Sequence, residues 1–411
     1  MNLSKFLNFV YSNYFWIITI NAFLYCFFRM KQYMLSILFP IVLYALAMLL
    51  PSPAKNKKNI YDVLIILIII CSIISWLIND YGHQSILILK HCLGPLSYMM
   101  VYFIGKKQIN CSSNQIFEQA LLPTFITCIV GIYCFFYPPQ WYYRAMADGE
   151  YASLEALRLH SIFSSPYQLA YMCCFLLGYL FFQKLQNGLK FGKIIVTYVI
   201  VYSFTLLLCM MRAPILGTII FLCGAIFIYL SQSYRKDRYL YVILGLVITF
   251  FVIFVGLQTL EKNDFIFYLN EKVEDASSFD FIISRYNLIE AHYSLWGDGA
   301  GRHNIWAREF ADCYAMPDGE YQKIQQEVGI IGMSIYVILF LLIILKCLYN
   351  IKYLMFELCA VIFLLISMIG ADPLSTIDKH PMIFWLLIGR VSAFSQNKMV
   401  VQQYNKSAKD E

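Results

Sequence analysis

Charged side chains are scarce in this chain of 411 residues. Asp, Glu, Lys and Arg together make up 14% of it, whereas soluble globular proteins average about 25%. Hydrophobic residues take their place and account for 60% of the sequence. Apolar runs near the length that crosses a bilayer, about 20 residues, recur along the chain. The composition therefore excludes an ordinary soluble domain. It predicts an all-α polytopic integral membrane protein in which residues 1–411 form a single transmembrane domain.

The cysteine patterns of a disulfide framework or a zinc site are also missing. Most of the 13 cysteines lie in apolar runs, where cysteine behaves as a small hydrophobe. The longest hydrophilic stretch, 257–327, contains only Cys313 and so forms no internal disulfide. Carboxylates with metal-binding spacing are not evident, and no internal repeat has a fixed period. We therefore expect neither a metal nor a cofactor.

Apolar runs predict about twelve helices that span the membrane. They cover 14–28, 33–50, 61–78, 88–105, 119–137, 166–183, 194–211, 213–230, 239–256, 328–347, 353–371 and 381–396.

Lysine and arginine collect in every second connection between these helices, for example at Lys106, Lys193 and Lys346, with Arg29 and Lys31 as the main exceptions. By the positive-inside rule these connections and both termini are cytoplasmic. Three segments then face outward: 138–165, the turn near residue 212, and a large loop at 257–327 with 13 acidic and 6 basic residues. Because the net charge of +6 is spread over short loops, we predict no nucleic-acid partner.

One arginine interrupts the apolar stretch 194–230, in the sequence "LLLCMMRAPILG". A charge at the centre of a bilayer costs roughly 2.5 kcal/mol or more. Two spans that meet near Arg212 would instead place it at the outer interface, with Pro214 in the first turn of the second span. An arginine that snorkels to the interface is the simpler explanation when Arg212 is considered alone.

Further arginines are predicted on the same face. Arg158 precedes the sixth predicted helix, and Arg285 and Arg302 lie in the large loop. Guanidinium groups bind phosphate oxygens in bidentate fashion and keep their charge, so a group of arginines favours an oxyanion site. Each of them could also pair with an acid of the loop. Arg144 and Arg308 are more typical of solvated loop residues.

The large loop also contains "GDGAGR" at 297–302, which lacks the spacing of a dinucleotide-binding loop. Gly297, Gly299 and Gly301 instead predict a tight backbone bend beside a ligand or a membrane surface. Gly329 and Gly332, at the start of the tenth predicted helix, predict close helix packing.

Acidic residues lie at the entry to that helix, in "PDGEYQKIQQEVGIIG". Asp318 and Glu320 are candidates for a general base, although Asp318 also suits an ordinary turn. Glu327 equally suits a helix start, where an acid complements the macrodipole. Trp141, Tyr142, Tyr143 and Tyr321 are candidates for stacking on sugars, and interface anchoring explains them equally well.

Four of these segments, within 155–335, resemble the elements of the O-antigen polymerase and O-antigen ligase superfamily. "RLHSIFSSPYQLA" is similar to the family's R-x-x-G/S-x-F-x-x-P-x-x-x-A element, and "LLLCMMRAPILG" to its Ser-Arg-Gly/Ala element, with Met211 in place of serine. "ISRYNLIEAHYSLWGDGAGR" resembles the arginine-led segment of the large loop. "DGEYQKIQQEVGIIG" resembles the start of the helix that follows it.

The resemblance implies a glycosyltransferase C-like fold in the bacterial inner membrane, with a periplasmic site for undecaprenyl-pyrophosphate-linked sugars. It implies that Arg158, Arg212 and Arg285 bind pyrophosphate, and a chain-length regulator is a possible partner. Ligases of the family carry a His-Asn pair where this chain has Asp318 and Gly319. This departure favours an O-antigen polymerase over a ligase. A lipid-linked oligosaccharide flippase or other transporter is the alternative from another class, and Arg390 and Glu357 are its clearest intrahelical charges.

Overall fold

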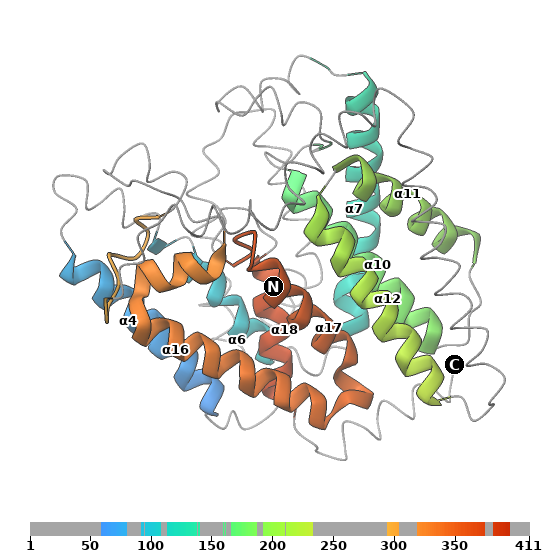
Figure 1. Ribbon diagram of the computed structural model, residues 1–411. Coiled ribbons are helices and arrows are strands. Elements are labelled where there is room, and N and C mark those ends of the chain that lie inside the picture. The colour runs from blue at the N-terminus through green and yellow to red at the C-terminus, as the bar shows by residue number, and fades with distance from the viewer. Residues whose placement is uncertain are drawn as a thin grey trace, which may run out of the picture.

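A computed structural model describes residues 59–79, 92–93, 95–107, 113–137, 139, 159, 161, 166–186, 192–209, 211–232, 294–303, 319–374 and 381–394. All regular structure in these ranges is α-helical (Figure 1). The helices are α4 (Ile60–Ile78), α6 (Val101–Lys107), α7 (Ser113–Phe136), α10 (Pro166–Gln186), α11 (Lys193–Cys209), α12 (Arg212–Gln232), α16 (Glu320–Tyr349), α17 (Ile351–Ser367) and α18 (Pro381–Ala393).

The predicted helices that fall on described residues are confirmed, with bounds that shift by a few residues. Only the last part of the predicted helix 88–105 lies in α6, and 14–28, 33–50 and 239–256 are outside the described residues. Within the described ranges, α4 and α16 are long and apolar enough to cross a membrane, and several other apolar helices are shorter. The larger difference concerns α16, which begins at Glu320 rather than at residue 328 and contains a break at Gly329.

Helix α17 lies between two groups of helices (Figure 1). On one side α16 packs along α4, and α6 packs along α18. On the other side α10 contacts α7, α11 and α12. Helices α16 and α17 are antiparallel and meet at Asn350, whose N–H is bonded to the carbonyl oxygens of Lys346 and Cys347. The chain therefore reverses repeatedly between two ends of the molecule.

Aromatic rings fill the contact between the two groups. The ring of Phe175 on α10 lies 5.0 Å from that of Phe384 on α18 and 5.7 Å from that of Phe221 on α12. The rings of Tyr171 and Phe363 are stacked at 5.3 Å. Offset and edge-to-face contacts at these distances are the arrangements that aromatic rings prefer. This cluster ties α10, α12, α17 and α18 into one core.

Glycines allow several of these helices to approach closely. A Cβ atom on Gly105 of α6 would overlap the carbonyl oxygen of Leu386 on α18, and one on Gly389 would overlap that of Tyr102. On α12, a Cβ atom on Gly217 would lie 2.7 Å from the Phe363 ring. Helices that pack at such short range need small residues at the contact.

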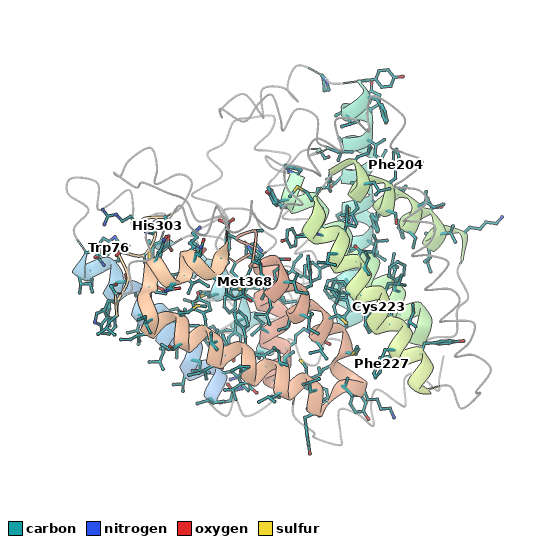
Figure 2. The ribbon with its side chains drawn as sticks, viewed as in Figure 1. Trp76, Phe204, Cys223, Phe227, His303 and Met368 are labelled. Atoms are coloured by element: carbon teal, nitrogen blue, oxygen red, sulfur yellow. The ribbon has the colours of Figure 1, made fainter. Side chains whose placement is uncertain are left out.

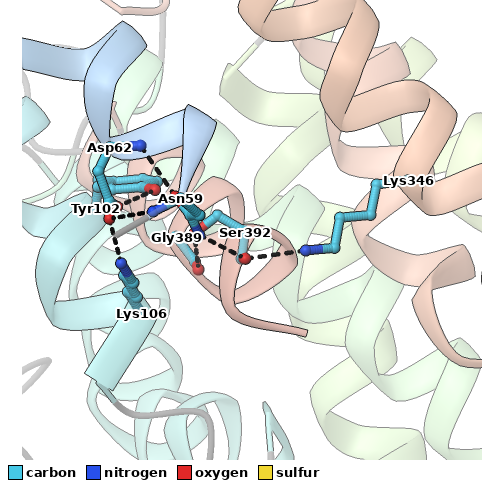
Figure 3. A network of polar contacts seen from close by, with 7 residues as sticks. All are labelled: Asn59, Asp62, Tyr102, Lys106, Lys346, Gly389 and Ser392. Atoms are coloured by element: carbon cyan, nitrogen blue, oxygen red, sulfur yellow. Dashed lines mark hydrogen bonds and ion pairs between the residues drawn. The ribbon is translucent and has the colours of Figure 1, made fainter. Parts of the chain in front are cut away.

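A polar network joins the helices at one end of the molecule (Figure 3). Asn59 and Asp62 form a capping box at the start of α4, with hydrogen bonds of 3.0 and 3.1 Å. The Asp62 carboxylate also accepts a hydrogen bond of 2.8 Å from the Tyr102 hydroxyl and forms an ion pair with Lys106. The buried charge of Asp62 is thereby compensated.

The same network reaches α16 and the end of α18. The carbonyl oxygen of Ser392 accepts hydrogen bonds of 3.0 Å from the Asn59 amide and 2.9 Å from the Lys346 ammonium (Figure 3). The sequence predicted that Lys106 and Lys346 lie on the same side of the protein, and the network places them at the same end.

The contact between α6 and α18 yields a test of the packing. We expect Gly389→Ala to destabilise the protein by roughly 1–3 kcal/mol, because the added Cβ meets rigid backbone rather than a side chain. The thermal unfolding midpoint of protein purified in detergent measures this. Gly192→Ala, where a Cβ meets nothing within 4 Å, is the matched control. An unchanged midpoint for Gly389→Ala would contradict the close approach.

Candidate functional site

The break in α16 lies at the end of the molecule opposite the Asp62 network (Figure 1). Gly329 has φ 70° and ψ −170°, a backbone conformation almost confined to glycine. Helix α16 therefore consists of a polar first segment, 320–328, and an apolar second segment, 330–349. The break leaves carbonyl groups of the first segment and N–H groups of the second without partners in the helix.

The segment 294–303 satisfies these backbone groups. The carbonyl oxygens of Ser294 and Leu295 accept hydrogen bonds from the N–H groups of Ile330 and Ile331, at 3.2 and 3.3 Å. The N–H of Asp298 donates to the carbonyl oxygen of Gln326 at 2.6 Å. The loop thus caps both helix ends that the break creates.

Helix α4 contributes to the same contact. The Ser75 hydroxyl donates to the carbonyl oxygen of Glu327, and the Asn79 amide donates to that of Gly297 at 3.2 Å. A Cβ atom on Gly297 would lie 2.5 Å from the Glu327 backbone, and one on Gly329 would overlap Gly297 and Leu295. The two glycines therefore allow the two backbones to touch.

The glycines of the loop have the conformations that the sequence predicted. Gly297, Gly299 and Gly301 all have positive φ, at 78°, 123° and 85°. The predicted tight bend is confirmed. Gly329, in contrast, forms the helix break rather than the helix–helix contact that the sequence suggested.

Arg302 and His303 end this loop. The Arg302 guanidinium donates to the carbonyl oxygen of Asp298 at 3.3 Å. The N–H of His303 donates to the Glu327 carboxylate at 3.1 Å, and its imidazole lies 3.9 Å from the Asp298 carboxylate. Figure 2 shows His303 near the bend of α16 and Trp76, at the same end as the loop. Arg302 and the carboxylates of Asp298 and Glu327 thus lie close together at the entrance to α16.

A second charged cluster joins the first segment of α16 to the connection after α17. The Lys323 ammonium lies 3.2 Å from the Asp372 carboxylate. Glu320 is buried, and its Oε2 accepts a hydrogen bond of 3.0 Å from the N–H of Leu374. The N–H of Glu320 donates to the carbonyl oxygen of Ala371 at 3.1 Å. These contacts fix residues 371–374 against the start of α16.

Lys323 keeps its charge in this buried setting. The segment 320–328 precedes the break and lies outside the apolar part of α16. Burial alone would lower the pKa of Lys323, but nearby carboxylates, Asp372 foremost, outweigh burial and raise the pKa above its usual value. A buried ammonium group with this compensation stays protonated.

Arg212 is the first residue of α12, which confirms the predicted junction of two helices near this position. Helix α12 runs antiparallel to α17, because Gly217 faces Phe363 whereas Gly224 faces Cys359. At about 1.5 Å per residue, the start of α12 is then level with the end of α17 at Ser367. The backbone of Arg212 therefore lies at the same end of the molecule as the Asp372 cluster.

The sequence element that begins at Arg158 contacts the junction of α11 and α12 through Leu159. Leu159 donates its N–H to the carbonyl oxygen of Leu208 at 3.1 Å, and its own carbonyl oxygen accepts from the Cys209 thiol. Both partners are in the last turn of α11, just before α12. Two of the segments that carry the family resemblance are thus in direct contact.

The structure describes only part of the predicted site. Arg302, Glu320 and Tyr321 have described side chains, and the Tyr321 hydroxyl donates to the carbonyl oxygen of Leu365 at 2.8 Å. For Arg212 the backbone is described. The predicted residues outside the described ranges are Trp141, Tyr142, Arg158, Arg285 and Asp318.

Sequence reasoning overlooked Lys323 and Asp372. Lys323 is the only lysine in 320–328 and has Glu320 and Glu327 at helical spacing on either side, a pattern that indicates one charged face. Nothing in the sequence connects it to Asp372, which is 49 residues away. Among the described residues, no group of three His, Cys, Asp or Glu side chains is arranged to hold a metal ion.

Comparison with protein-family models gives no match, and no curated protein is significantly similar to the chain.

The contact between the loop and the break yields a second test. Gly329→Ala should destabilise the protein by roughly 1–3 kcal/mol or more, because alanine adopts this backbone conformation only under strain and its Cβ would overlap the loop. Limited proteolysis, monitored within 294–303, reports the loss of the loop contact. Gly370→Ala, with open space around the added Cβ, is the control. Equal protection of the two variants would contradict the role given to the break.

Proposed function

We propose that this chain is a glycosyltransferase of the bacterial inner membrane, an O-antigen polymerase. It joins oligosaccharide repeat units carried on undecaprenyl pyrophosphate at the periplasmic face. The observation that carries the proposal is the position of Arg212, at the first residue of α12 and at the same end as the Glu320–Asp372 cluster and the glycine-rich loop.

Exposed apolar side chains support a location in the membrane. Along α4 the exposed residues include Ile66, Ile70 and Leu77, and along α16 they include Leu341 and Leu345. Exposure of such continuous apolar faces to water is unfavourable, whereas lipid chains cover them without cost. The proposal includes about twelve spans, cytoplasmic termini and the large periplasmic loop 257–327.

The local position of Arg212 favours an anionic ligand. The N-terminus of a helix carries a partial positive charge, and acidic residues usually stabilise it. Helix α12 has no acidic residue in its first turn and begins with an arginine instead. Helix α10, which starts at Pro166 beside the same junction, also has no acid in its first turn. Helix N–H groups and a guanidinium fork together suit a phosphate group.

In the proposed reaction, a hydroxyl of the incoming repeat unit attacks the anomeric carbon of the growing chain. The bond from that carbon to the pyrophosphate oxygen breaks, and the electron pair leaves with undecaprenyl pyrophosphate. Arg158, Arg212 and Arg285 neutralise the charge that develops on this leaving group. Arg302, at the end of the loop that caps the helix break, is a further cation for the pyrophosphate.

The attacking hydroxyl must lose a proton to a base. Asp318 and Glu320, at the entry to α16, are the candidates that the sequence supplies. Trp141, Tyr142 and Tyr321 are proposed to stack on the sugars. No metal takes part in the proposed reaction, because the guanidinium groups supply the positive charge. A chain-length regulator is the proposed protein partner.

Two other functions make different demands on the chain. A ligase would transfer the finished glycan to the lipid A core, and the resemblance favours it less because Asp318 and Gly319 replace the His-Asn pair. A transporter would use charges within the membrane. Arg390 and Glu357 lie 3.8 Å apart, so each compensates the other, and the pair is explained without a transported substrate.

Deletion of the gene separates these functions. Loss of a polymerase leaves a single repeat unit on the lipid A core, whereas loss of a ligase leaves bare core. Gel profiles of the lipopolysaccharide, before and after complementation, give the answer. A long-chain ladder that persists after deletion would refute the assignment.

The role of Arg212 has a test of its own. Arg212→Ala should reduce long-chain polysaccharide by about 100-fold or more, as the loss of one transition-state contact does, while the protein still accumulates in the membrane. Arg212→Lys should restore only part, because an ammonium lacks the bidentate fork. Lys352→Ala, an exposed cation at the opposite end of α17, is the control and should keep a normal ladder. A normal ladder from Arg212→Ala would remove Arg212 from the reaction.

A further inference from the structure

The connection between α17 and α18 contains Asp372, whose carboxylate forms an ion pair and is also partly exposed. The Asp372 side chain is 31% exposed, and its Oδ2 lies 3.2 Å from the ammonium of Lys323, whose side chain is 3% exposed. The ion pair with the buried Lys323 ammonium therefore fixes the position of the Asp372 carboxylate. The exposed remainder of the carboxylate is free to meet a substrate.

We propose that Asp372 is the general base that takes the proton of the acceptor hydroxyl, and that Lys323 is its positioning residue. This inference rests on the proposed polymerase function. It assigns the base to a residue that the sequence alone did not indicate.

Glu320 is poorly placed for that task by comparison. It is 1% exposed, and one of its carboxylate oxygens already accepts the N–H of Leu374. The N–H of Glu320 also donates to the carbonyl oxygen of Ala371, so Glu320 is hydrogen-bonded to residues on both sides of Asp372 in the sequence. Glu320 therefore orients the segment that presents Asp372, whereas Asp372 itself reaches the surface.

Asp372 also lies where the other elements of the proposed site meet. It follows the end of α17, on which the ring of Tyr171 from α10 stacks against Phe363. The same stretch of α17 faces the first turns of α12, so the end of α17 is level with Arg212. Figure 2 shows Met368, at the start of this connection, closer to the loop end than Cys223 and Phe227 of α12. A base and a phosphate-binding arginine on neighbouring elements suit a reaction that needs both.

The proton balance of the step is simple. As the acceptor oxygen bonds to the anomeric carbon, its proton passes to the Asp372 carboxylate. The electron pair of the broken bond leaves on the pyrophosphate. Lys323 stays protonated throughout and holds the Asp372 carboxylate in place through the ion pair.

The alternative is that Lys323 and Asp372 form an ion pair that only stabilises the fold. Exchange of the two charges distinguishes this structural role from the role of a general base. Asp372→Asn should accumulate normally, because Glu320 and Glu327 still compensate Lys323. It should lower long-chain polysaccharide by about 100-fold or more, as the loss of a general base does. The double variant Lys323→Asp/Asp372→Lys keeps one charge of each sign, so it should accumulate and yet fail to restore the ladder.

Lys323 is tested through its conservative replacement. Lys323→Arg should retain a substantial part of the ladder because it keeps the cation beside Asp372, whereas Lys323→Met should lose it at equal protein levels. The measurement is the chain-length profile of lipopolysaccharide in the deletion strain, normalised to the amount of protein in the membrane.

Three results would overturn the inference: a normal ladder from Asp372→Asn, a ladder restored by the charge exchange, or failure of both variants to accumulate. The last two would give the pair a structural role only. The proposed function fails separately, when deletion of the whole gene leaves the ladder intact. If deletion abolishes the ladder but Asp372→Asn does not, only the assignment of the base is wrong.

Discussion

The arrangement at the proposed site depends on the hydrogen bonds that the peptide groups at the break in α16 form with residues outside the helix. A helix interrupted in apolar surroundings exposes N–H and carbonyl groups, and each one left unpaired costs several kcal/mol. Here the backbone of 294–303 and the Ser75 hydroxyl of α4 bond to them, and the Asn79 amide, just after α4, holds the loop itself through the carbonyl oxygen of Gly297. The same contacts fix the direction of segment 320–328, and that segment carries Glu320 and Lys323. The break therefore positions the charged cluster, because the cluster cannot move without loss of these hydrogen bonds.

Charge is distributed differently at the two ends of the molecule. At one end Asp62, Lys106 and Lys346 neutralise each other or bond to backbone, and their network joins four helices. At the other end an arginine begins α12, and Asp372 remains partly exposed beside a buried lysine. The first arrangement stabilises the fold. The second leaves groups of both signs at one face, as the transfer of a sugar from a pyrophosphate would require.

Much of the helical structure follows from the sequence, since long apolar runs predict helices and glycine or proline near their ends predicts the boundaries. The junction of two helices near Arg212 was predicted from the cost of a charge inside an apolar stretch, and the bend at Gly297, Gly299 and Gly301 from the three glycines; both are confirmed. The break at Gly329 was not predicted, because a glycine within a helical pattern is compatible with a continuous helix. The pair of Lys323 and Asp372 arises from tertiary packing across 49 residues, which no local pattern reports.

The central claim is that the end with the helix break, Asp372 and Arg212 faces the periplasm. Gly370 is exposed beside Asp372 and has open space around an added side chain, so Gly370→Cys places a thiol at that end with little disturbance. Tyr349→Cys places one at the opposite end, at an exposed position. In spheroplasts treated with a membrane-impermeant maleimide, we predict labelling of the Gly370→Cys protein above the wild-type background, and labelling of Tyr349→Cys only after the membrane is permeabilised. The reverse pattern would place the cluster in the cytoplasm and contradict the account.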